Sequence, residues 1–220
     1  MTPSLPVLET WVRPVTGVHT NLEIQRMPGA TSSHLYRVKS AHDTWVLRAF
    51  DDSRWLEGVQ DLAEREAAIL KHLVTGSIPA PRLVAFDPDM ALVLMTFESG
   101  KVFLPSNPEL AWLGELARQL HEIHEATVES VGGRYRSWRN STSEVRPNWF
   151  DDAEVWQVIQ QVLDRGAPPT PLRFIHRDYH PVNVLWKDGR ISSVVDWDKC
   201  LLRSSVRRRC SLPGKPRVDV

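Results

Sequence analysis

One short stretch, residues 174–198, constrains the fold of this chain more than any other. It reads FIHRDYHPVNVLWKDGRISSVVDWD and gathers a His, an Asn and several Asp residues into a loop followed by a hairpin. One residue separates His176 from Asp178, and Asn183 follows five positions later. An Asp-Gly pair between two β-rich runs is a strong hairpin signal. The hairpin returns the chain to the loop, which predicts that Asp196 lies near Asp178 and Asn183.

These residue types match the needs of phosphoryl transfer. The reaction needs a carboxylate that accepts the proton of an attacking hydroxyl, and hard oxygen ligands that hold Mg²⁺ on the phosphates. We expect Asp178 to supply the first, and Asn183 with Asp196 to supply the second. His176 needs no chemical role and would brace the loop through hydrogen bonds. The run His-Arg-Asp, four further residues and Asn is the complete catalytic-loop signature of kinases.

Upstream of this stretch, the pattern predicts a small sheet and one helix. β-rich runs bounded by turn residues indicate strands over residues 22–27, 34–38, 44–50, 82–86 and 91–97. Apolar residues at helical spacing indicate a helix over 59–74. The last of the strands is strongly apolar, which is typical of a strand buried on both faces.

The turn between the first two expected strands contains the segment PGATSS. Its small residues would let backbone amides and hydroxyl groups, including those of Ser32 and Ser33, approach a phosphate. An ordinary hairpin loop explains the same residues, because the pattern is weaker than a Gly-rich fingerprint. Both interpretations are open at this point.

Two charged residues occupy unusual positions in the expected elements. Arg48 lies in the middle of the strand 44–50, and Glu66 lies on the apolar stripe of the helix, four residues from both Leu62 and Leu70. A carboxylate on a core-facing stripe is costly unless it is paired. Either Glu66 reaches water at the edge of the stripe, or it forms an ion pair with Arg48 that would position this cation over a nucleotide.

The composition changes along the chain. We expect three parts, an N-terminal nucleotide-binding lobe over 1–97, a catalytic lobe over 98–200 and a basic tail over 201–220. In the second part, Asn107-Pro108 predicts a helix start, with Asn as the cap and Pro in the first turn. A further helix is expected over 150–163. The polar stretch between these helices is a long loop of the kind that often carries function.

Charge and composition argue against several classes of protein. The 220 residues include 27 Lys or Arg and 27 Asp or Glu, so the zero net charge favours neither nucleic acid nor an acidic membrane as a partner. Two cysteines without zinc spacing, no signal peptide and no apolar run of membrane-spanning length predict a cytoplasmic protein. The sequence carries no indication of the oligomeric state.

On these residues the chain resembles the aminoglycoside phosphotransferase-like family of small-molecule kinases. The resemblance rests on FIHRDYHPVNVLW and VVDWD, with support from REAAILKHL, VLMTFESG and LARQLHEIH, and covers roughly residues 20–200. It implies an α+β, two-lobe protein-kinase-like fold, with an N-terminal antiparallel sheet plus helix and a mostly helical C-terminal lobe. It also implies ATP and Mg²⁺ as cofactors, and a small-molecule hydroxyl acceptor that is aminoglycoside-like, a sugar or an amino alcohol.

The resemblance further implies roles for several residues of the stretch 174–198. Asp178 would be the catalytic base, with His176 beside it in the catalytic loop. Asn183 and Asp196 would be the magnesium ligands. Asp198 would be a secondary acid near the metal or the substrate. The run Asp-Trp-Asp stands where protein kinases have Asp-Phe-Gly.

Other residues would bind the nucleotide if the resemblance holds. Arg48 would anchor the phosphates, with Glu66 as its partner on the helix. The segment Thr96, Phe97 and Glu98 would be the hinge that contacts adenine. Arg48 stands where kinases usually have Lys, and its bulkier bidentate guanidinium predicts a differently shaped phosphate contact.

The sequence changes character after Cys200. The last 20 residues hold six basic residues and one acidic residue, and they show no helical stripe. Members of the family normally continue with helices that complete the larger lobe. We therefore expect a disordered or out-of-frame tail and an incomplete second lobe. A nucleotide-binding remnant with impaired catalysis is the alternative function that follows from this expectation.

A third interpretation comes from a different class of enzyme. The pattern His-x-Asp-x-His suits a transition metal, so a metallohydrolase cluster could be formed by His176, Asp178, His180, Asp196 and Asp198. The remaining histidines lie far upstream in no metal-ligand pattern. This interpretation is therefore weaker than phosphoryl transfer.

Overall fold

The computed structural model describes residues 3–29, 33–50, 59–128, 146, 148–164 and 172–204. Ser32, most of the polar stretch 127–148 and the tail from residue 205 onward lie outside the described residues. Contacts along the chain divide it into two compact units, Met1–Arg134 with Phe174–Leu202, and Tyr135–Arg173 with Arg203–Val220. The first unit contains every described residue of the main sheet, of helix α2 (Val59–Leu73) and of the stretch Phe174–Leu202.

Five antiparallel strands form the main sheet, in the order β1-β2-β3-β5-β4. Their bounds are Glu23–Met27 for β1, Ser33–Lys39 for β2, Thr44–Phe50 for β3, Leu83–Asp87 for β4 and Leu92–Thr96 for β5. Each strand lies within one residue of the bounds that the sequence predicts. The apolar strand β5 is buried from Leu92 to Met95. It lies between β3 and β4, so neither of its edges is open.

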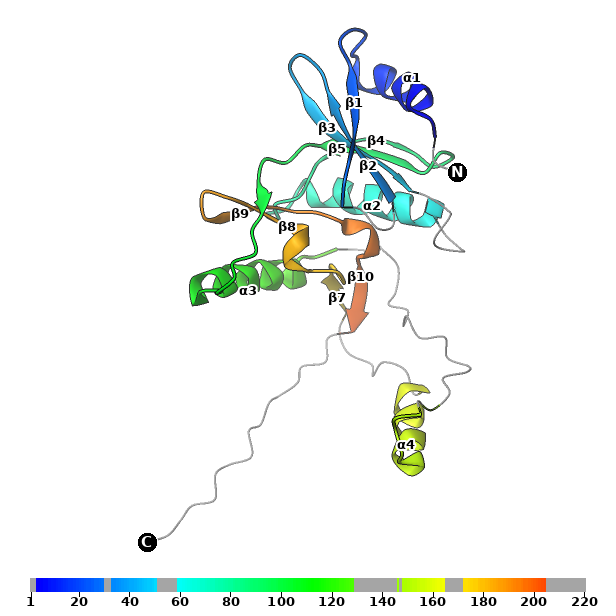
Figure 1. Ribbon diagram of the computed structural model, residues 1–220, viewed down its shortest axis with the longest axis vertical. Helices are drawn as coiled ribbons and strands as arrows, with labels where there is room; N and C mark the ends of the chain where they lie inside the picture. The colour runs from blue at the N-terminus through cyan, green and yellow to red at the C-terminus, as the bar shows by residue number, and fades with distance from the viewer. Residues whose placement is uncertain are drawn as a thin grey trace. The chain divides into compact units, whose positions relative to one another are not determined.

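Helices cover both faces of this sheet (Figure 1). Helix α1 (Leu5–Thr16) packs Leu8 and Val12 into one apolar cluster with the sheet. Helix α2 packs Ile69 and Leu70 into a second cluster with the opposite face. Because successive strand residues point to opposite faces, Leu47 joins the α1 cluster while Arg48 points toward α2.

A second, smaller sheet follows the main one. Strands β6 (Lys101–Val102), β8 (Val184–Lys187) and β9 (Arg190–Val194) pair in the order β6-β8-β9. The predicted hairpin is confirmed, and its turn residues Asp188 and Gly189 have φ values of 51° and 75°, as a two-residue hairpin turn requires. Gly100 packs against this hairpin so closely that a Cβ would lie 2.4 Å from Ser192 Oγ. A side chain at position 100 would therefore push the linker away from the hairpin.

Helix α3 (Leu110–Glu125) begins later than the sequence predicts. The expected start at Asn107-Pro108 is wrong, because Glu109 keeps an extended backbone with φ −78° and ψ 155°. The first helical hydrogen bond then runs from Leu113 N to Glu109 O over 3.1 Å. No side chain caps this end of the helix.

Helix α4 (Ala153–Asp164) belongs to the second unit, and it too begins later than expected. Asp152 provides the reason, since its Oδ1 accepts hydrogen bonds from Glu154 N and Val155 N at 3.0 and 2.9 Å. This is the bonding of an N-cap residue, and it sets the helix start just after Asp152.

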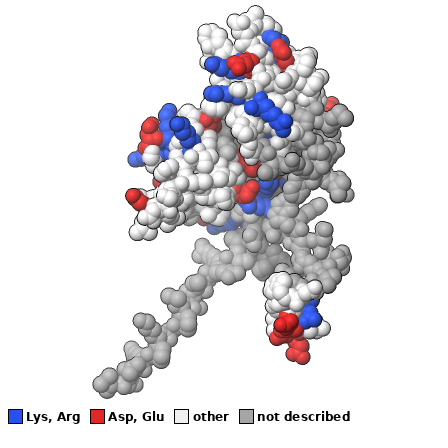
Figure 2. Space-filling view, in the orientation of Figure 1, with Lys and Arg blue, Asp and Glu red and all other residues white. Residues whose placement is uncertain are grey.

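Two short strands flank the stretch that carries the motif. Strands β7 (Leu172–Ile175) and β10 (Leu201–Ser204) pair in a two-stranded sheet. The first four residues of the expected basic tail are therefore a strand. Across the described ranges, the structure contains no helix that is both long and apolar enough to cross a membrane. On the face shown in Figure 2, basic and acidic side chains lie in mixed groups.

Candidate active site

Backbone hydrogen bonds shape the loop after β7. The carbonyl oxygen of Asp178 accepts hydrogen bonds from His180 N at 2.8 Å and from Asn183 Nδ2 at 3.0 Å. His180 caps the short 3-10 helix η1 (Pro181–Asn183), with its Nδ1 accepting from Val182 N at 3.3 Å. The Asn183 amide is thereby oriented with Nδ2 toward the loop, which leaves Oδ1 as its remaining acceptor. The loop thus presents the Asp178 carboxylate and the Asn183 carbonyl oxygen together.

His176 lies beneath this loop and is 1% exposed. Its Nε2 lies 2.9 Å from Val195 O, and its ring centroid lies 4.5 Å from that of Trp197. Burial lowers the pKa of His176, which favours the neutral ring with Nε2–H as the donor to the carbonyl. The contact is of the bracing kind that the sequence suggests, and it joins the start of the loop to the end of β9.

Arg48 is the centre of a buried ionic cluster. Its Nε donates to Ser33 Oγ at 2.8 Å, and its NH1 donates to Glu66 Oε1 at 2.8 Å. Its NH2 lies 2.6 Å from Asp196 Oδ1 and 3.2 Å from Asp198 Oδ2. The guanidinium therefore joins β2, β3 and α2 to the residues after β9. Of the two interpretations left open for Glu66, the ion pair with Arg48 is the one that the structure contains.

The cluster holds more negative than positive charge. Burial raises the pKa of Glu66 to about 7, although Arg48 opposes this shift. Burial likewise raises the pKa of Asp198, again against Arg48. Burial also disfavours the Asp196 anion, but Arg48 and Lys199 outweigh it and lower the pKa of that carboxyl. One guanidinium is thus shared by three carboxylates, and burial, which Arg48 offsets only in part, favours the protonated form of Glu66 by raising its pKa.

Lys199 approaches the cluster from its open side. Its Nζ lies 3.2 Å from Asp178 Oδ2 and 3.9 Å from Asp196 Oδ2. The lysine side chain is 19% exposed and that of Asp178 is 43% exposed. The sequence analysis did not single out Lys199. Its only signal there was its position directly after the Asp-Trp-Asp run.

Two residues in the segments that carry the carboxylates have a left-handed backbone. Arg177 has a φ of 65° and Asp196 has a φ of 70°. Such a conformation is unfavourable for residues other than Gly and persists only where surrounding contacts hold it. Around Asp196 those contacts are Val195 N to Asn183 O at 2.9 Å and Trp197 Nε1 to Val194 O at 2.7 Å. The turn sends Trp197 into the core while Asp196 faces Arg48.

Trp197 anchors the segment that carries the carboxylates of Asp196 and Asp198. It is fully buried and stacks on Phe174, with ring centroids 6.0 Å apart and an interplanar angle of 3°. It shares an apolar cluster with Ile69 and Leu70 of α2. The same helix that provides Glu66 thus also provides the apolar surface for Trp197. The sequence analysis assigned no role to this tryptophan.

The expected hinge residues bond to the main sheet and to each other. Thr96 Oγ1 donates to Glu98 Oε1 at 2.6 Å and accepts from Arg82 N at 2.8 Å. The amide of Phe97 donates to Thr44 O at 3.3 Å. These groups are therefore already bonded within the protein, and the role of the segment as a hinge stays a prediction.

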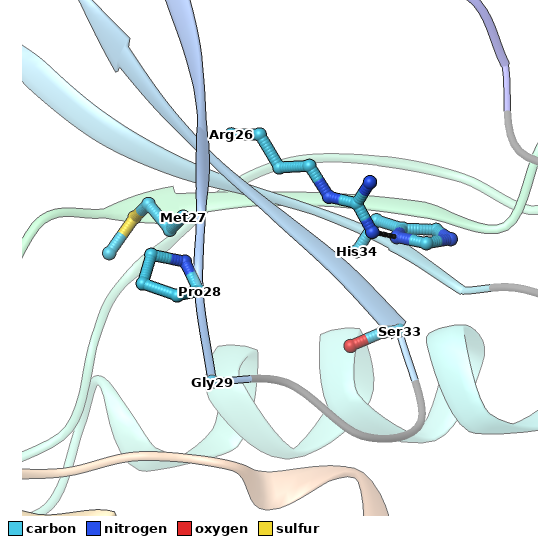
Figure 3. A pocket seen from close by; sticks show the side chains of 6 residues that line it. All are labelled: Arg26, Met27, Pro28, Gly29, Ser33 and His34. Atoms are coloured by element: carbon cyan, nitrogen blue, oxygen red, sulfur yellow. Dashed lines mark hydrogen bonds between the residues drawn. The ribbon is translucent and has the colours of Figure 1, made fainter.

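A pocket of about 410 Å³ lies at the end of the β1–β2 hairpin (Figure 3). It is lined by Arg26, Met27, Pro28, Gly29, Ser33 and His34. Arg26 NH2 lies 2.6 Å from His34 Nδ1. Ser33 is shared between this pocket and the Arg48 cluster, where its hydroxyl accepts from the guanidinium. The phosphate-loop interpretation of this turn stays a prediction, since Ser32 lies outside the described residues.

The five residues of the metallohydrolase interpretation do not form a metal site. In the part of the chain that the structure describes, no group of three or more His, Cys, Asp or Glu side chains is placed to hold one ion. His176 Nε2 and His180 Nδ1 both bond to the backbone instead. The pattern His-x-Asp-x-His here shapes a loop.

Comparison with known proteins agrees with this geometry. A family model described as the phosphotransferase enzyme family matches residues 23–203. The match spans the main sheet, α2, α3 and the whole motif-bearing stretch. A search of curated proteins gave no significant match.

Solved structures of phosphotransferases share the fold. The macrolide 2'-phosphotransferase MphH of Brachybacterium faecium is 18% identical with a TM-score of 0.64, and the match covers 90% of this chain and 73% of MphH. A Ralstonia eutropha protein assigned to the aminoglycoside phosphotransferases is 18% identical with a TM-score of 0.60, over 91% of this chain and 66% of that one. Aminoglycoside phosphotransferase APH(4)-Ia is 17% identical with a TM-score of 0.59, over 90% and 73%.

This chain thus spans 66% to 73% of the lengths of these three structures. They show the same kinase-like arrangement of an antiparallel sheet with helices, which confirms the predicted α+β fold. The family model matches most of the chain and includes each carboxylate of the site. The chain therefore belongs to the phosphotransferase enzyme family.

Proposed function

We propose that the chain transfers the γ-phosphoryl group of ATP to a hydroxyl group of a small molecule. The observation that carries this proposal is the position of Asp196 between two cations, Arg48 at 2.6 Å and Lys199 at 3.9 Å, with Asp178 next to the second cation. A half-exposed carboxylate and a metal-binding carboxylate on one side of a buried cationic anchor are the parts that phosphoryl transfer needs.

Asp178 is the base in this proposal. Its exposed carboxylate accepts the proton of the acceptor hydroxyl as the hydroxyl oxygen forms a bond to the γ-phosphorus. The bond between that phosphorus and the bridging oxygen breaks, and ADP leaves with the electron pair. Asn183 holds the backbone of Asp178 in place through Nδ2, so the base and the metal-binding loop keep a fixed spacing.

Asn183, Asp196 and Asp198 would hold Mg²⁺. Asp198 Oδ1 is buried and has no hydrogen-bond partner among the described residues, and the three carboxylates around Arg48 leave an excess of negative charge. A divalent cation with oxygen ligands would bond to the first and offset the second. When bound, Mg²⁺ neutralises charge on the nucleotide phosphates.

Several residues of the first unit would hold the nucleotide. Arg48 and Glu66 would fix the position of Asp196 and Asp198, the two carboxylates that would face the phosphates. The hinge Thr96–Glu98 would contact adenine through its remaining backbone groups. Ser33, at the start of β2, would approach the phosphates, and we expect the same of Ser32, which lies outside the described residues.

Solved structures of the same fold support the choice of an acceptor class. APH(4)-Ia has been solved with ADP and hygromycin B, and APH(2")-IIa with gentamicin and with streptomycin and ATP. We propose that this chain likewise phosphorylates a hydroxylated small molecule, an amino sugar, sugar or amino alcohol, with ATP as the donor.

The test is ATP turnover by the unaltered chain and by Asp178→Asn with a panel of hydroxylated acceptors that includes hygromycin B and a macrolide. Loss of the base should lower kcat by about 10²- to 10⁴-fold while ATP binding changes little. Asp89→Asn, an exposed carboxylate in the β4–β5 turn, is the matched control. Unchanged turnover in Asp178→Asn would contradict the assigned base, and ATP binding without turnover of any acceptor would favour the nucleotide-binding remnant.

A further inference from the structure

We propose that Lys199 binds the γ-phosphate of ATP and is a catalytic residue of this site. The inference rests on the proposed phosphotransferase function and adds a cation that neither the motif nor the family match assigns. It places the phosphate-binding cation on the segment after β9, two residues beyond Trp197, rather than on the sheet.

The first argument is position. In phosphoryl transfer the γ-phosphoryl group lies between the base that holds the acceptor hydroxyl and the metal ligand that holds the phosphates. Lys199 Nζ lies between the residues proposed for those two roles, 3.2 Å from Asp178 Oδ2 and 3.9 Å from Asp196 Oδ2. An ammonium group at this place meets the three equatorial oxygens on which the charge of the transferring group is spread.

The second argument is the contrast with Arg48. Arg48 is buried, with a side chain that is 6% exposed, and its guanidinium donates to Ser33, Glu66, Asp196 and Asp198. A phosphate that bonded Arg48 directly would have to displace a buried carboxylate. The Lys199 side chain is less buried, and its contacts with the two carboxylates are made by Nζ alone. A lysine ammonium has three donors on a flexible stem. It can turn from Asp178 toward a phosphate without disturbing the core.

The third argument is the rigid base from which this flexible side chain extends. Trp197, Asp198 and Cys200 are all fully buried, and Cys200 N closes the 3-10 helix η2 (Trp197–Lys199) on Trp197 O at 3.2 Å. Lys199 is the one side chain of positions 197–200 that is not buried. The backbone thus fixes where the lysine starts, and the side chain alone adapts to the ligand.

The alternative is that Lys199 only braces the two carboxylates, and nucleotide discrimination separates the two roles. We would measure binding of ADP and of the non-hydrolysable analogue β,γ-imido-ATP, each with excess magnesium, by titration calorimetry. Lys199→Met should weaken imido-ATP binding by about tenfold or more, because a charge-assisted contact is lost. ADP, which has no γ-phosphate, should bind within about twofold of the unaltered chain.

Lys199→Arg should restore most of the preference for imido-ATP, since it keeps a cation at the same place. Lys71→Met removes an exposed lysine of α2 and should change neither affinity. Thermal unfolding of each variant shows whether it is folded, and Lys199→Arg keeps the test decisive if Lys199→Met is not.

Two results would overturn the assignment while leaving the proposed function intact. One is an equal loss of ADP and imido-ATP binding in Lys199→Met, which indicates a structural role. The other is unchanged binding of both. If the unaltered chain bound neither nucleotide, the proposed function itself would fail, and the assignment of Lys199 with it.

Discussion

Asp196 has two neighbourhoods, and they differ in almost every physical respect. On one side it meets Arg48, whose side chain is 6% exposed. Arg48 also bonds Glu66 and Asp198, whose side chains are 1% and 0% exposed. On the other side it meets Lys199 at 19% exposed, which bonds Asp178 at 43% exposed. The buried side is crowded and short of positive charge, while the open side has two charged groups within reach of solvent.

The difference in burial indicates a structural role for the Arg48 side of Asp196 and a more exchangeable set of contacts on the Lys199 side. A buried ion pair contributes little net stability over an apolar replacement, but removal of one partner leaves charges without compensation. A half-exposed pair is weak and easily exchanged for other partners. The Arg48 side therefore holds the elements together, and the Lys199 side is free to exchange protein contacts for substrate contacts.

The largest expected effect tests the buried side. Arg48→Met leaves three carboxylates around an apolar side chain, and we expect it to lower the free energy of unfolding by about 3–5 kcal/mol in buffer with a chelator. Chemical denaturation followed by tryptophan fluorescence measures this. Lys199→Met is the matched variant on the open side and should cost less than about 1 kcal/mol. Equal losses in the free energy of unfolding for the two variants would contradict the difference between the buried side and the open side of Asp196.

A smaller effect concerns the pH dependence of stability that the buried His176 produces. Burial lowers the pKa of His176 below its ordinary 6.5, so below that pH the unfolded chain binds a proton that the folded chain does not. Stability contributed by His176 should thus be lost as the pH falls from about 6.5, at up to about 1.4 kcal/mol per pH unit.

Glu66 acts in the opposite direction. Its pKa is raised from 4.5 to about 7, so the folded chain binds its proton more tightly and gains stability as the pH falls from 7 toward 4.5. The difference in melting temperature between the unaltered chain and His176→Gln, followed from pH 7.5 to 5, isolates the histidine. A difference that does not change with pH would contradict a neutral, buried His176.

The smallest expected effect refines the boundary of the buried side. Ser33→Ala removes one acceptor of the Arg48 guanidinium and should lower the free energy of unfolding by about 1 kcal/mol. Ser40→Ala is a suitable control, because the Ser40 hydroxyl next to β2 is likewise an acceptor, here of hydrogen bonds from His42 N and Asp43 N, but lies outside the cluster. A loss in Ser33→Ala no larger than in the control would show that Arg48 depends on its carboxylates alone.

Much of the fold follows from local patterns. Strand β3 has the predicted bounds Thr44–Phe50, and the Asp188-Gly189 turn forms the predicted hairpin. Both depend on neighbouring residues, so a sequence reading can find them. Helix α1 was not predicted. Leu8 and Val12 bury one face of it against the sheet, although Pro14 lies inside the helix.

The candidate site divides in the same way. The loop residues Asp178 and Asn183 are found from spacing alone, and the pairing of Arg48 with Glu66 could be posed from the sequence but not decided. Lys199 could not be found, because its reach toward Asp178 depends on the left-handed backbone at Asp196 and on the burial of Trp197. Those are consequences of tertiary packing rather than of local sequence.

The hydrogen bond between Arg48 and Asp198 joins residues 150 positions apart. Folding rates fall as contacts connect more distant parts of a chain, because the loop between them must be closed before the contact forms. The main sheet can form from hairpins and one crossover. Of the four cluster partners of Arg48, only Ser33 and Glu66 are available until the segment after residue 195, with Asp196 and Asp198, has joined the sheet and α2. We therefore expect the Asp196 and Asp198 carboxylates of the candidate site to join the cluster late in folding, after Arg48 has paired with Ser33 and Glu66.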